Sequence, residues 1–174
     1  MRRTVPVVLA TALVVGALRP DGLAASPTPV PSLCSASEKP LIRWIVKGGD
    51  KLVSVCASAD FAKDRGYLQY RFGRPGKVEL QFPATTGGTH RQFTYSHYFR
   101  ARFDETSLSF VNGGHRYTLR DDYDGEQRKA VKTTSITVEP NDGKGRTTEI
   151  KCHELAPSDL AALGDALPNE EHDD

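Results

Sequence analysis

Glycine-containing turn signals recur at short intervals along this chain, and they leave little room for long helices. Gly, Asn and Asp readily adopt the left-handed backbone conformations that tight hairpins require. Clusters of such turn residues lie at positions 48–50, 73–76, 86–89, 112–114 and 141–145. The runs between them are short and contain many β-branched and aromatic side chains, which is typical of strands. The spacing therefore predicts an all-β fold, either an antiparallel sandwich or a small barrel of about eight strands.

The alternation of side chains within these runs predicts which faces are buried. The expected strands occupy residues 41–47, 51–56, 66–72, 77–82, 92–103, 107–111, 115–120, 131–139 and 147–152. The clearest alternation lies in the fifth of these runs, which is expected to be one continuous strand. Phe93, Tyr95, His97 and Phe99 share one face there and are predicted to point into the core. His97 is accordingly expected to be a core histidine with its polar atoms satisfied.

The N-terminus has the order of features that characterises a secretory signal peptide. Arg2 and Arg3 precede an uncharged apolar run at 5–18, and small residues follow up to Ala25. The apolar run is about 14 residues long, whereas a bilayer-spanning helix needs about 20. Residues 1–25 are therefore predicted to be a signal peptide, and the mature protein is expected to be periplasmic or secreted, without a stable membrane anchor.

The rest of the chain is expected to contain a single folded domain. Residues 26–40 form an extended leader in which prolines alternate with small residues. A β-rich globular domain is predicted for 41–156, followed at 157–174 by a short helix and an acidic tail. The helix is expected at 158–167, with Ser158 as its N-cap. About 150 residues remain after removal of the signal peptide, which suits one core.

Three cysteines in an exported chain allow one disulfide and one free thiol. Cys152 follows Ile150 in period-2 register and is predicted to face the core. A bond between Cys34 and Cys152 would tie the two ends of the domain together and close a long loop, so this pairing is the preferred prediction. A bond between Cys56 and Cys152 is the alternative. The remaining thiol is expected to be a buried core residue rather than a nucleophile.

The chain carries no motif for catalysis, metal binding or a cofactor. It contains no Gly-x-Ser-x-Gly sequence. The acidic run at 121–126 resembles a calcium loop, but Arg120 and Val131 then occupy its first and twelfth ligand positions, where carboxylates are needed. The five histidines lack the paired spacing of zinc ligands. We therefore expect no metal, no cofactor and no enzyme. The alternative is a small envelope hydrolase whose histidines and acids meet only in the folded protein.

The near balance of charges argues against nucleic acid as a partner, because 23 basic residues face 22 acidic ones. Arginine and tyrosine, in contrast, gather in a way that is typical of protein interfaces. The candidate binding residues are Arg71, Arg74, His115, Arg116 and Tyr117. The alternative role for these arginines is to pair with nearby acids or to cover sheet faces with their aliphatic stems. The sequence leaves the oligomeric state open.

Several segments together resemble a group of small exported proteobacterial proteins of unknown function. They are residues 53–58, 66–73, 113–117 and 149–152, and the most specific piece is Tyr-Leu-Gln-Tyr-Arg-Phe-Gly at 67–73. This resemblance implies a location in the cell envelope and a β-rich fold, and it carries no activity. Members of the group often have a further cysteine near the position of Val46, which leaves the pairing of Cys56 open.

A second resemblance is to the bacterial inhibitors of c-type lysozyme, which are exported β-barrels with a Ser-Gly-x-x-Tyr loop. The run from Gly113 to Tyr117 contains the Gly-x-x-Tyr part, with Lys129 or Lys132 in the place of a downstream lysine. Gly113 stands where those inhibitors have serine. The resemblance implies a lysozyme-like protein partner. The sequence as a whole thus favours an exported, non-enzymatic protein-binding or inhibitor-like module.

Overall fold

The computed structural model describes residues 30–169, so the predicted signal peptide and the last five residues of the acidic tail lie outside the described residues. Nine strands of this part form one sheet. They are β1 (Glu38–Val46), β2 (Leu52–Ser58), β3 (Leu68–Arg74), β4 (Lys77–Phe82), β5 (Thr94–Arg100), β6 (Phe103–Asn112), β7 (His115–Asp124), β8 (Val131–Pro140) and β9 (Thr148–Glu154). A 3-10 turn, η1 (Thr89–Gln92), precedes β5, and a single helical turn, α1 (Ala161–Gly164), follows β9.

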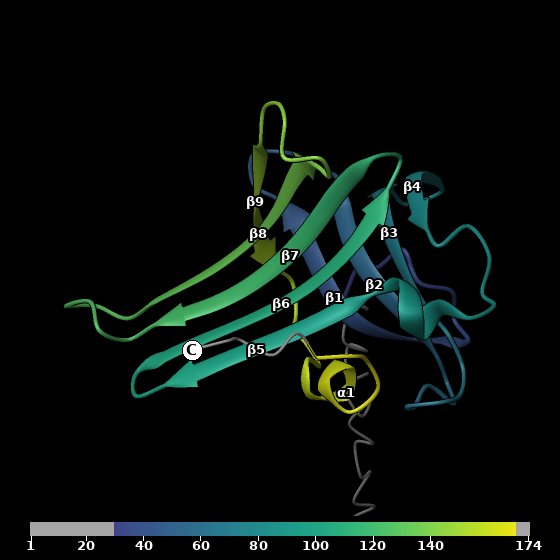
Figure 1. Ribbon diagram of the computed structural model, residues 1–174, viewed down its shortest axis with the longest axis horizontal. Helices are drawn as coiled ribbons and strands as arrows, with labels where there is room; N and C mark the ends of the chain where they lie inside the picture. Colours follow the sequence, from purple (N-terminus) through teal and green to yellow (C-terminus); the bar gives the residue numbers. More distant parts are fainter. Residues whose placement is uncertain (1–29, 170–174) are drawn as a thin grey trace, which may run out of the picture.

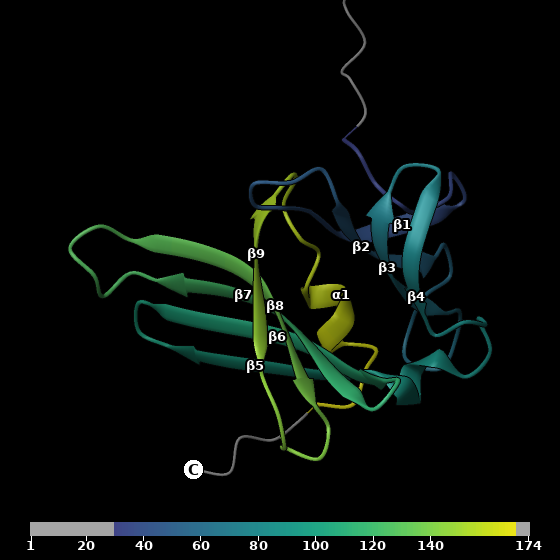
Figure 2. The ribbon, with the colours of Figure 1, turned by 90° about the horizontal axis from the view of Figure 1, so that it is seen from above.

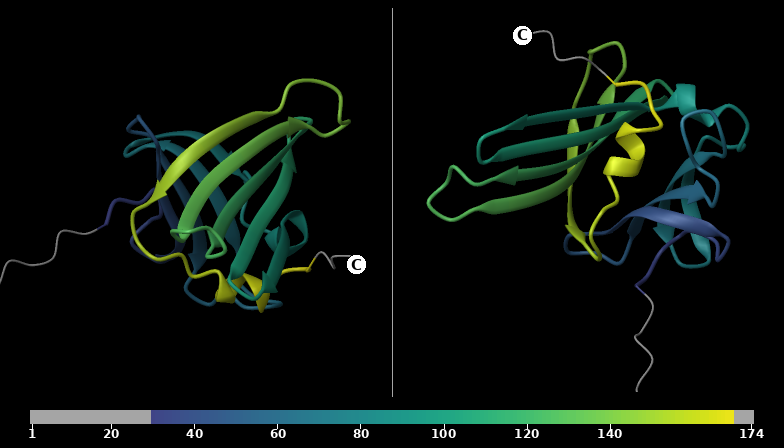
Figure 3. Two further views of the ribbon diagram at one scale, coloured as in Figure 1. Left: turned by 90° about the vertical axis from the view of Figure 1, so that its left-hand side faces the viewer. Right: turned by 90° about the horizontal axis from the view of Figure 1, so that it is seen from below.

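The nine strands follow the order β4-β3-β2-β1-β9-β8-β7-β6-β5, and all neighbours are antiparallel. The pairing of β1 with β9 joins the hairpins of the first half of the domain to those of the second. The sheet curls into a half-barrel, with β4 and β5 as its two edges (Figure 1; Figure 3). The prediction of an antiparallel all-β fold with a short helix near the C-terminus is confirmed.

The core fills the concave face of the curled sheet. Trp44, Tyr70 and Phe93 are among its largest fully buried side chains. Aromatic rings from the two halves of the sheet meet there: Phe110 of β6 stacks on Phe82 of β4 at 4.5 Å between ring centroids, and such ring pairs add to the hydrophobic stabilisation. The far ends of β5–β8 extend beyond this core, as Figure 2 shows from above.

The predicted single strand at 92–103 is wrong, because it is interrupted by a tight turn. β5 ends at Arg100 and β6 begins at Phe103, and Arg102 adopts a positive φ of 66° between them. No glycine marks this turn, and the alternation of apolar residues runs straight through it. Phe93 and Tyr95 are buried as predicted. His97, in contrast, is not in the core, because the outer half of β5 extends past the packed interior.

The predicted disulfide between Cys34 and Cys152 is also wrong: Cys34 is bonded to Cys56, and Cys152 is a free, buried thiol. The reason is the sheet itself. The segment around Leu33 lies on the outer face of β2, where the Leu33 N–H donates to the Ser54 hydroxyl, and Cys56 shares that face by period-2 alternation. Cys152 points to the concave side with the core, so the sheet separates it from Cys34.

The C-terminal segment after β9 crosses the concave side of the sheet (Figure 3). Its helix is much shorter than the predicted 158–167, because only 161–164 are α-helical. Ser158 is bonded to Glu154 instead of capping a helix. Leu163 and Leu167 are buried against the core, so this segment closes part of the open side of the half-barrel. Between residues 30 and 169 no helix is long and apolar enough to cross a membrane.

Candidate functional site

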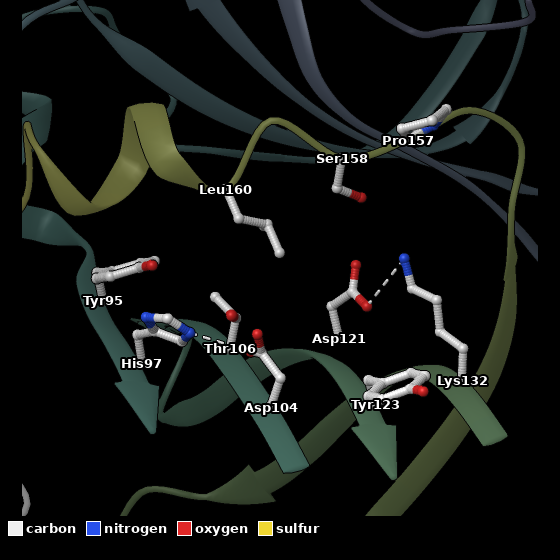
Figure 4. A pocket seen from close by; sticks show the side chains of 10 residues that line it. All are labelled: Tyr95, His97, Asp104, Thr106, Asp121, Tyr123, Lys132, Pro157, Ser158 and Leu160. Carbon is white, nitrogen blue, oxygen red and sulfur yellow. Dashed lines mark hydrogen bonds and ion pairs between the residues drawn. The ribbon is translucent and has the colours of Figure 1, made fainter. Parts of the chain in front are cut away.

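A cavity of about 480 Å³ lies between the extended part of β5–β8 and the C-terminal segment (Figure 4). The sheet provides its floor and wall, and Pro157, Ser158 and Leu160 provide the opposite side. Here the concave face is lined by polar and aromatic side chains and is not filled by the core. The strands therefore present polar and aromatic groups there that would be covered elsewhere on the concave face.

Strand register brings the polar residues of this cavity onto one face. Asp121 of β7 is directly opposite Thr106 on one side and Thr134 on the other, and Tyr123 is opposite Asp104 and Lys132. Directly paired residues share a face of the sheet. Leu119, two residues before Asp121, is buried in the core, so the inward face of β7 changes from apolar to acidic where it leaves the packed interior.

A chain of hydrogen bonds ties the sheet to the C-terminal segment at the back of the cavity. The Lys132 Nζ donates to the Glu154 carboxylate at 2.7 Å. Glu154 also accepts from the backbone N–H and the hydroxyl of Ser158, at 2.7 and 2.8 Å. The Ser158 hydroxyl accepts in turn from the Trp44 indole Nε1 at 3.2 Å. Burial pushes the pKa of Glu154 upward, but the bonds from Lys132 and Ser158 outweigh it and lower the pKa.

Asp121 is the most buried carboxylate of the cavity, with 7% of its side chain exposed. Its Oδ1 lies 3.3 Å from Lys132 Nζ, whereas its Oδ2 is buried and has no hydrogen-bond partner. Burial raises the pKa of Asp121, and Lys132 and the Ser158 hydroxyl only partly offset this effect. Figure 4 shows the second oxygen pointing into the cavity, toward the side formed by Leu160 and Ser158. Buried carboxylate oxygens without a partner are rare in folded proteins.

A histidine–aspartate pair lies at the other end of the cavity. The His97 Nε2 is 3.0 Å from Asp104 Oδ1, and each side chain is 42% exposed. Tyr95, the inner neighbour of His97 on this face, is mostly buried, and this burial raises the pKa of its phenol. The lining of the cavity thus combines two tyrosines, two carboxylates, one lysine and one histidine around a partly open space, and Glu154 lies behind it in contact with Lys132.

The contacts of the site do not assemble a nucleophile with a base. The Ser158 hydroxyl donates to the Glu154 carboxylate at 2.8 Å. The described hydrogen bonds pair His97 with Asp104 alone. Nucleophilic catalysis needs the hydroxyl and its base in contact. The one thiol that is free, Cys152, is buried in the core, and this burial raises its pKa to about 11.

Within residues 30–169, one group of three potential metal-ligating side chains has its ligand atoms close together, and it lies away from the cavity: Cys34, Glu38 and Cys56. Both sulfurs of this group are joined in the disulfide, and thiolates are the form that binds metal. The carboxylate of the group, Glu38, is bonded by Arg71. The described part of the chain therefore offers no assembled metal centre.

The predicted binding residue Arg71 is committed to an internal ion pair. It bonds Glu38 through both terminal nitrogens at 2.7 Å and also the Leu33 carbonyl at 2.9 Å. Tyr67 donates to the same carboxylate at 3.0 Å. Burial would raise the pKa of Glu38, but the bonds from Arg71 and Ser35 hold it at about 2. Arg71 thus anchors the segment that carries Cys34.

The other predicted binding residues lie at two separate hairpins. Arg74 pairs with Asp50 at 2.8 Å and Glu79 at 3.1 Å near the β3–β4 turn. His115 is exposed beside the β6–β7 turn and Arg116 follows it on β7. Tyr117 instead points inward, and its ring stacks parallel to Phe110 at 5.0 Å. Arg71 and Arg74 lie on the same strand but have separate partners, and His115 and Arg116 lie at another turn. A protein-binding role for these residues stays a prediction.

The sequence did not predict the cavity residues, because no motif marks them. Only the alternation of side chains along β7 indicates on which face of the sheet they lie. Asp121 and Tyr123 belong to a run that looks like an acidic surface turn, yet both lie within β7. Their period-2 relation to Leu119 is the signal that could have placed them on the inward face of β7, where Asp121 is buried and Tyr123 is partly exposed. The contributions of Ser158 and Leu160 depend on how the C-terminal segment crosses the sheet, which no local pattern encodes.

The fold and site define a curled single-sheet half-barrel with a polar and aromatic cavity on its concave side. Comparison with protein-family models gives no match to this chain. Neither a curated protein nor a solved structure matches it either.

Proposed function

We propose that this chain is an exported, non-catalytic module that binds a small molecule in its concave cavity. Export is supported by the signal-peptide pattern of residues 1–25 and by the disulfide between Cys34 and Cys56, a bond that persists in oxidising compartments. We therefore expect the binding event to take place in the periplasm or outside the cell.

The observation that carries the proposal is the cavity of about 480 Å³, which falls within the size range of small-molecule sites. Ligand sites combine apolar and aromatic walls with a few polar groups that fix the orientation of the ligand. Tyr95, Tyr123 and Leu160 supply the apolar surface here, while Asp121 and Asp104 supply the polar groups. Trp44 touches the back of the site through Ser158 and is the one tryptophan of the chain.

One variant pair tests the role of the cavity wall. Tyr123→Ala removes an aromatic ring from the cavity. We expect it to lower the affinity for any ligand found by at least about tenfold, because the ring provides much of the apolar contact. Tyr98→Ala is the matched control, since Tyr98 alternates to the other face of β5 and does not line the cavity. Both variants should keep the melting temperature within a few degrees of the parent protein.

The measurement is a small-molecule screen on the mature domain, read by Trp44 fluorescence and by backbone amide NMR shifts. We expect hits whose shifts cluster on β5–β8 and near Ser158, and whose affinity falls in Tyr123→Ala but not in Tyr98→Ala. Hits that map elsewhere, or hits that both variants bind equally, would overturn the proposal.

A second candidate function is hydrolysis, and the contact between His97 and Asp104 favours it. A carboxylate that orients an imidazole is the arrangement of a general base, which activates a water molecule for attack. The imidazole also faces the cavity in which a substrate would lie (Figure 4). Turnover of ester, amide or glycoside substrates that is lost in His97→Ala would establish this function. Binding without turnover in the parent protein supports the non-catalytic module.

A further inference from the structure

We propose that the cavity selects an organic cation that carries a primary ammonium group, with Asp121 as its counter-ion. This inference rests on the proposed small-molecule function and names the chemical class of the ligand. Three independent observations support it: an unpartnered carboxylate oxygen, an excess of negative charge and the aromatic composition of the wall.

The unpartnered oxygen is the most specific of the three observations. Asp121 is more than nine-tenths buried, and its Oδ2 has no hydrogen-bond donor among the described residues. Leaving such an oxygen without a donor is unfavourable in a folded protein. The neighbouring hydroxyl of Ser158 does not provide one, because it donates to Glu154. A ligand N–H that enters from the cavity would supply the missing donor.

The charges around the cavity do not balance. Lys132 is shared between two carboxylates, with its Nζ 3.3 Å from Asp121 and 2.7 Å from Glu154. Asp104 adds a third carboxylate, whose described partner is the His97 imidazole. With Glu154 counted, which contacts Lys132 but does not line the cavity, one ammonium is matched by three carboxylates. A bound cation would reduce this excess in a partly desolvated site, where charge interactions are stronger than in water.

The wall favours an organic cation over a metal ion. Two tyrosine rings, Tyr95 and Tyr123, lie on the same face of the sheet as Asp121, and aromatic rings attract ammonium groups. A metal ion needs several ligand atoms around one point, yet the carboxylates of this cavity do not bring three such atoms together. The geometry suits one ammonium at Asp121 and an apolar body against the rings.

The test compares three probes that share one ring and differ in charge: benzylamine, benzyl alcohol and benzoate. Each is titrated into the mature domain while the amide shifts of β5–β8 and the Trp44 fluorescence are followed. We expect benzylamine to bind at least about tenfold more tightly than the other two probes. Equal or tighter binding of the alcohol or of benzoate overturns the inference, as does failure of benzylamine to shift the cavity residues.

Asp121→Asn removes the charge and keeps the size of the side chain, so it should lower the affinity for benzylamine by at least about tenfold. Asp122→Asn is the matched control, because this neighbouring carboxylate lies on the opposite face of β7 and should leave the affinity unchanged. Lys132→Met should act in the opposite direction and tighten benzylamine binding, because it removes the competing ammonium. Benzylamine affinity that is the same in Asp121→Asn and the parent protein contradicts the inference.

The same experiment separates the failure of this inference from that of the proposed function. If the alcohol or benzoate binds and Tyr123→Ala abolishes this binding, the cavity is a ligand site and the cation inference is wrong. If calcium chloride shifts the cavity residues and Asp121→Asn removes that response while benzylamine gives none, the site prefers a metal ion and the inference is also wrong. If screening hits from the wider library all map away from the cavity, the proposed function itself fails.

Discussion

At the scale of single residues, carboxylates that are fully bonded in the fold differ from Asp121 and Asp122, each of which keeps one buried oxygen without a partner. Glu38 is nearly fully buried and is bonded by Arg71, Tyr67 and the Ser35 backbone N–H. Asp121 has comparable burial but keeps one oxygen without a donor. Fully bonded buried charges hold the fold together, whereas the unsatisfied oxygen of Asp121 points into the cavity, where a ligand could bond it (Figure 4).

The Glu38–Arg71 pair predicts a specific dependence of stability on pH. Glu38→Gln should lower the free energy of unfolding by about 3 kcal/mol at pH 7, because it leaves a buried guanidinium without its counter-charge. The pKa of Glu38 is about 2 in the folded protein against an ordinary value of 4.5. Its contribution is therefore complete above pH 4.5 and is lost as the pH falls toward 2.

Urea unfolding of the parent protein and of Glu38→Gln between pH 7 and pH 2 measures this effect. The difference between the two proteins should shrink below pH 4.5. Glu79→Gln is the control, because Glu79 pairs with Lys51 and Arg74 on the surface and should give a much smaller change. A difference that stays constant across the pH range would refute the assignment.

At the scale of elements, the hairpins show what the local pattern determines and what it does not. The predicted strand 77–82 coincides with β4, because glycine turns and a proline mark its ends. The turn between β5 and β6 was missed, because neither Ala101 nor Arg102 interrupts the apolar alternation. Local sequence thus predicts strands that end at glycine or proline. A turn without such residues depends on the pairing of its two strands, which local sequence does not show.

The β3–β4 hairpin offers a comparison of two glycines with different constraints. Gly73 lies at a bulge with φ 146°, and a Cβ there would be 2.4 Å from the Lys77 carbonyl oxygen. Gly76 has φ 75°, and nothing lies within 4 Å of a Cβ at that position. Gly76→Ala should cost about 1 kcal/mol through backbone strain alone, and Gly73→Ala should cost at least about 3 kcal/mol because the backbone must also shift. Thermal unfolding of the two variants gives the comparison, and equal losses would contradict it.

At the scale of the whole molecule, pairings between distant segments determine what local sequence does not. The predicted disulfide is wrong because the chain before β1 lies on the outer face of β2, while Cys152 faces the core. Local sequence does not encode this arrangement. The cavity was missed for the same reason, since Ser158 and Lys132 meet through Glu154 only after β9 pairs with β8. Periodicity identifies the buried face of each strand, but the half-barrel decides which faces come together.

Reduction of the disulfide tests its place in this arrangement. The bond between Cys34 and Cys56 spans 22 positions of sequence, and its loss should lower stability by about 3 kcal/mol in the chain-entropy model. The double variant Cys34→Ser, Cys56→Ser should show the same loss without reductant. Cys152→Ala should leave the effect of dithiothreitol on the melting temperature intact, since Cys152 is not part of the bond. A melting temperature that is insensitive to reductant would contradict the pairing.

The contact between the C-terminal segment and β5 has a practical consequence. The Tyr95 N–H donates to the Pro168 carbonyl, and Asn169 forms a parallel bridge with Tyr95, whose side chain lines the cavity. Asn169 therefore lies beside a strand residue whose ring lines the cavity. An environment-sensitive dye attached to a cysteine introduced at position 169 would report on occupancy of the cavity, whereas a bulky label at the same position would crowd it.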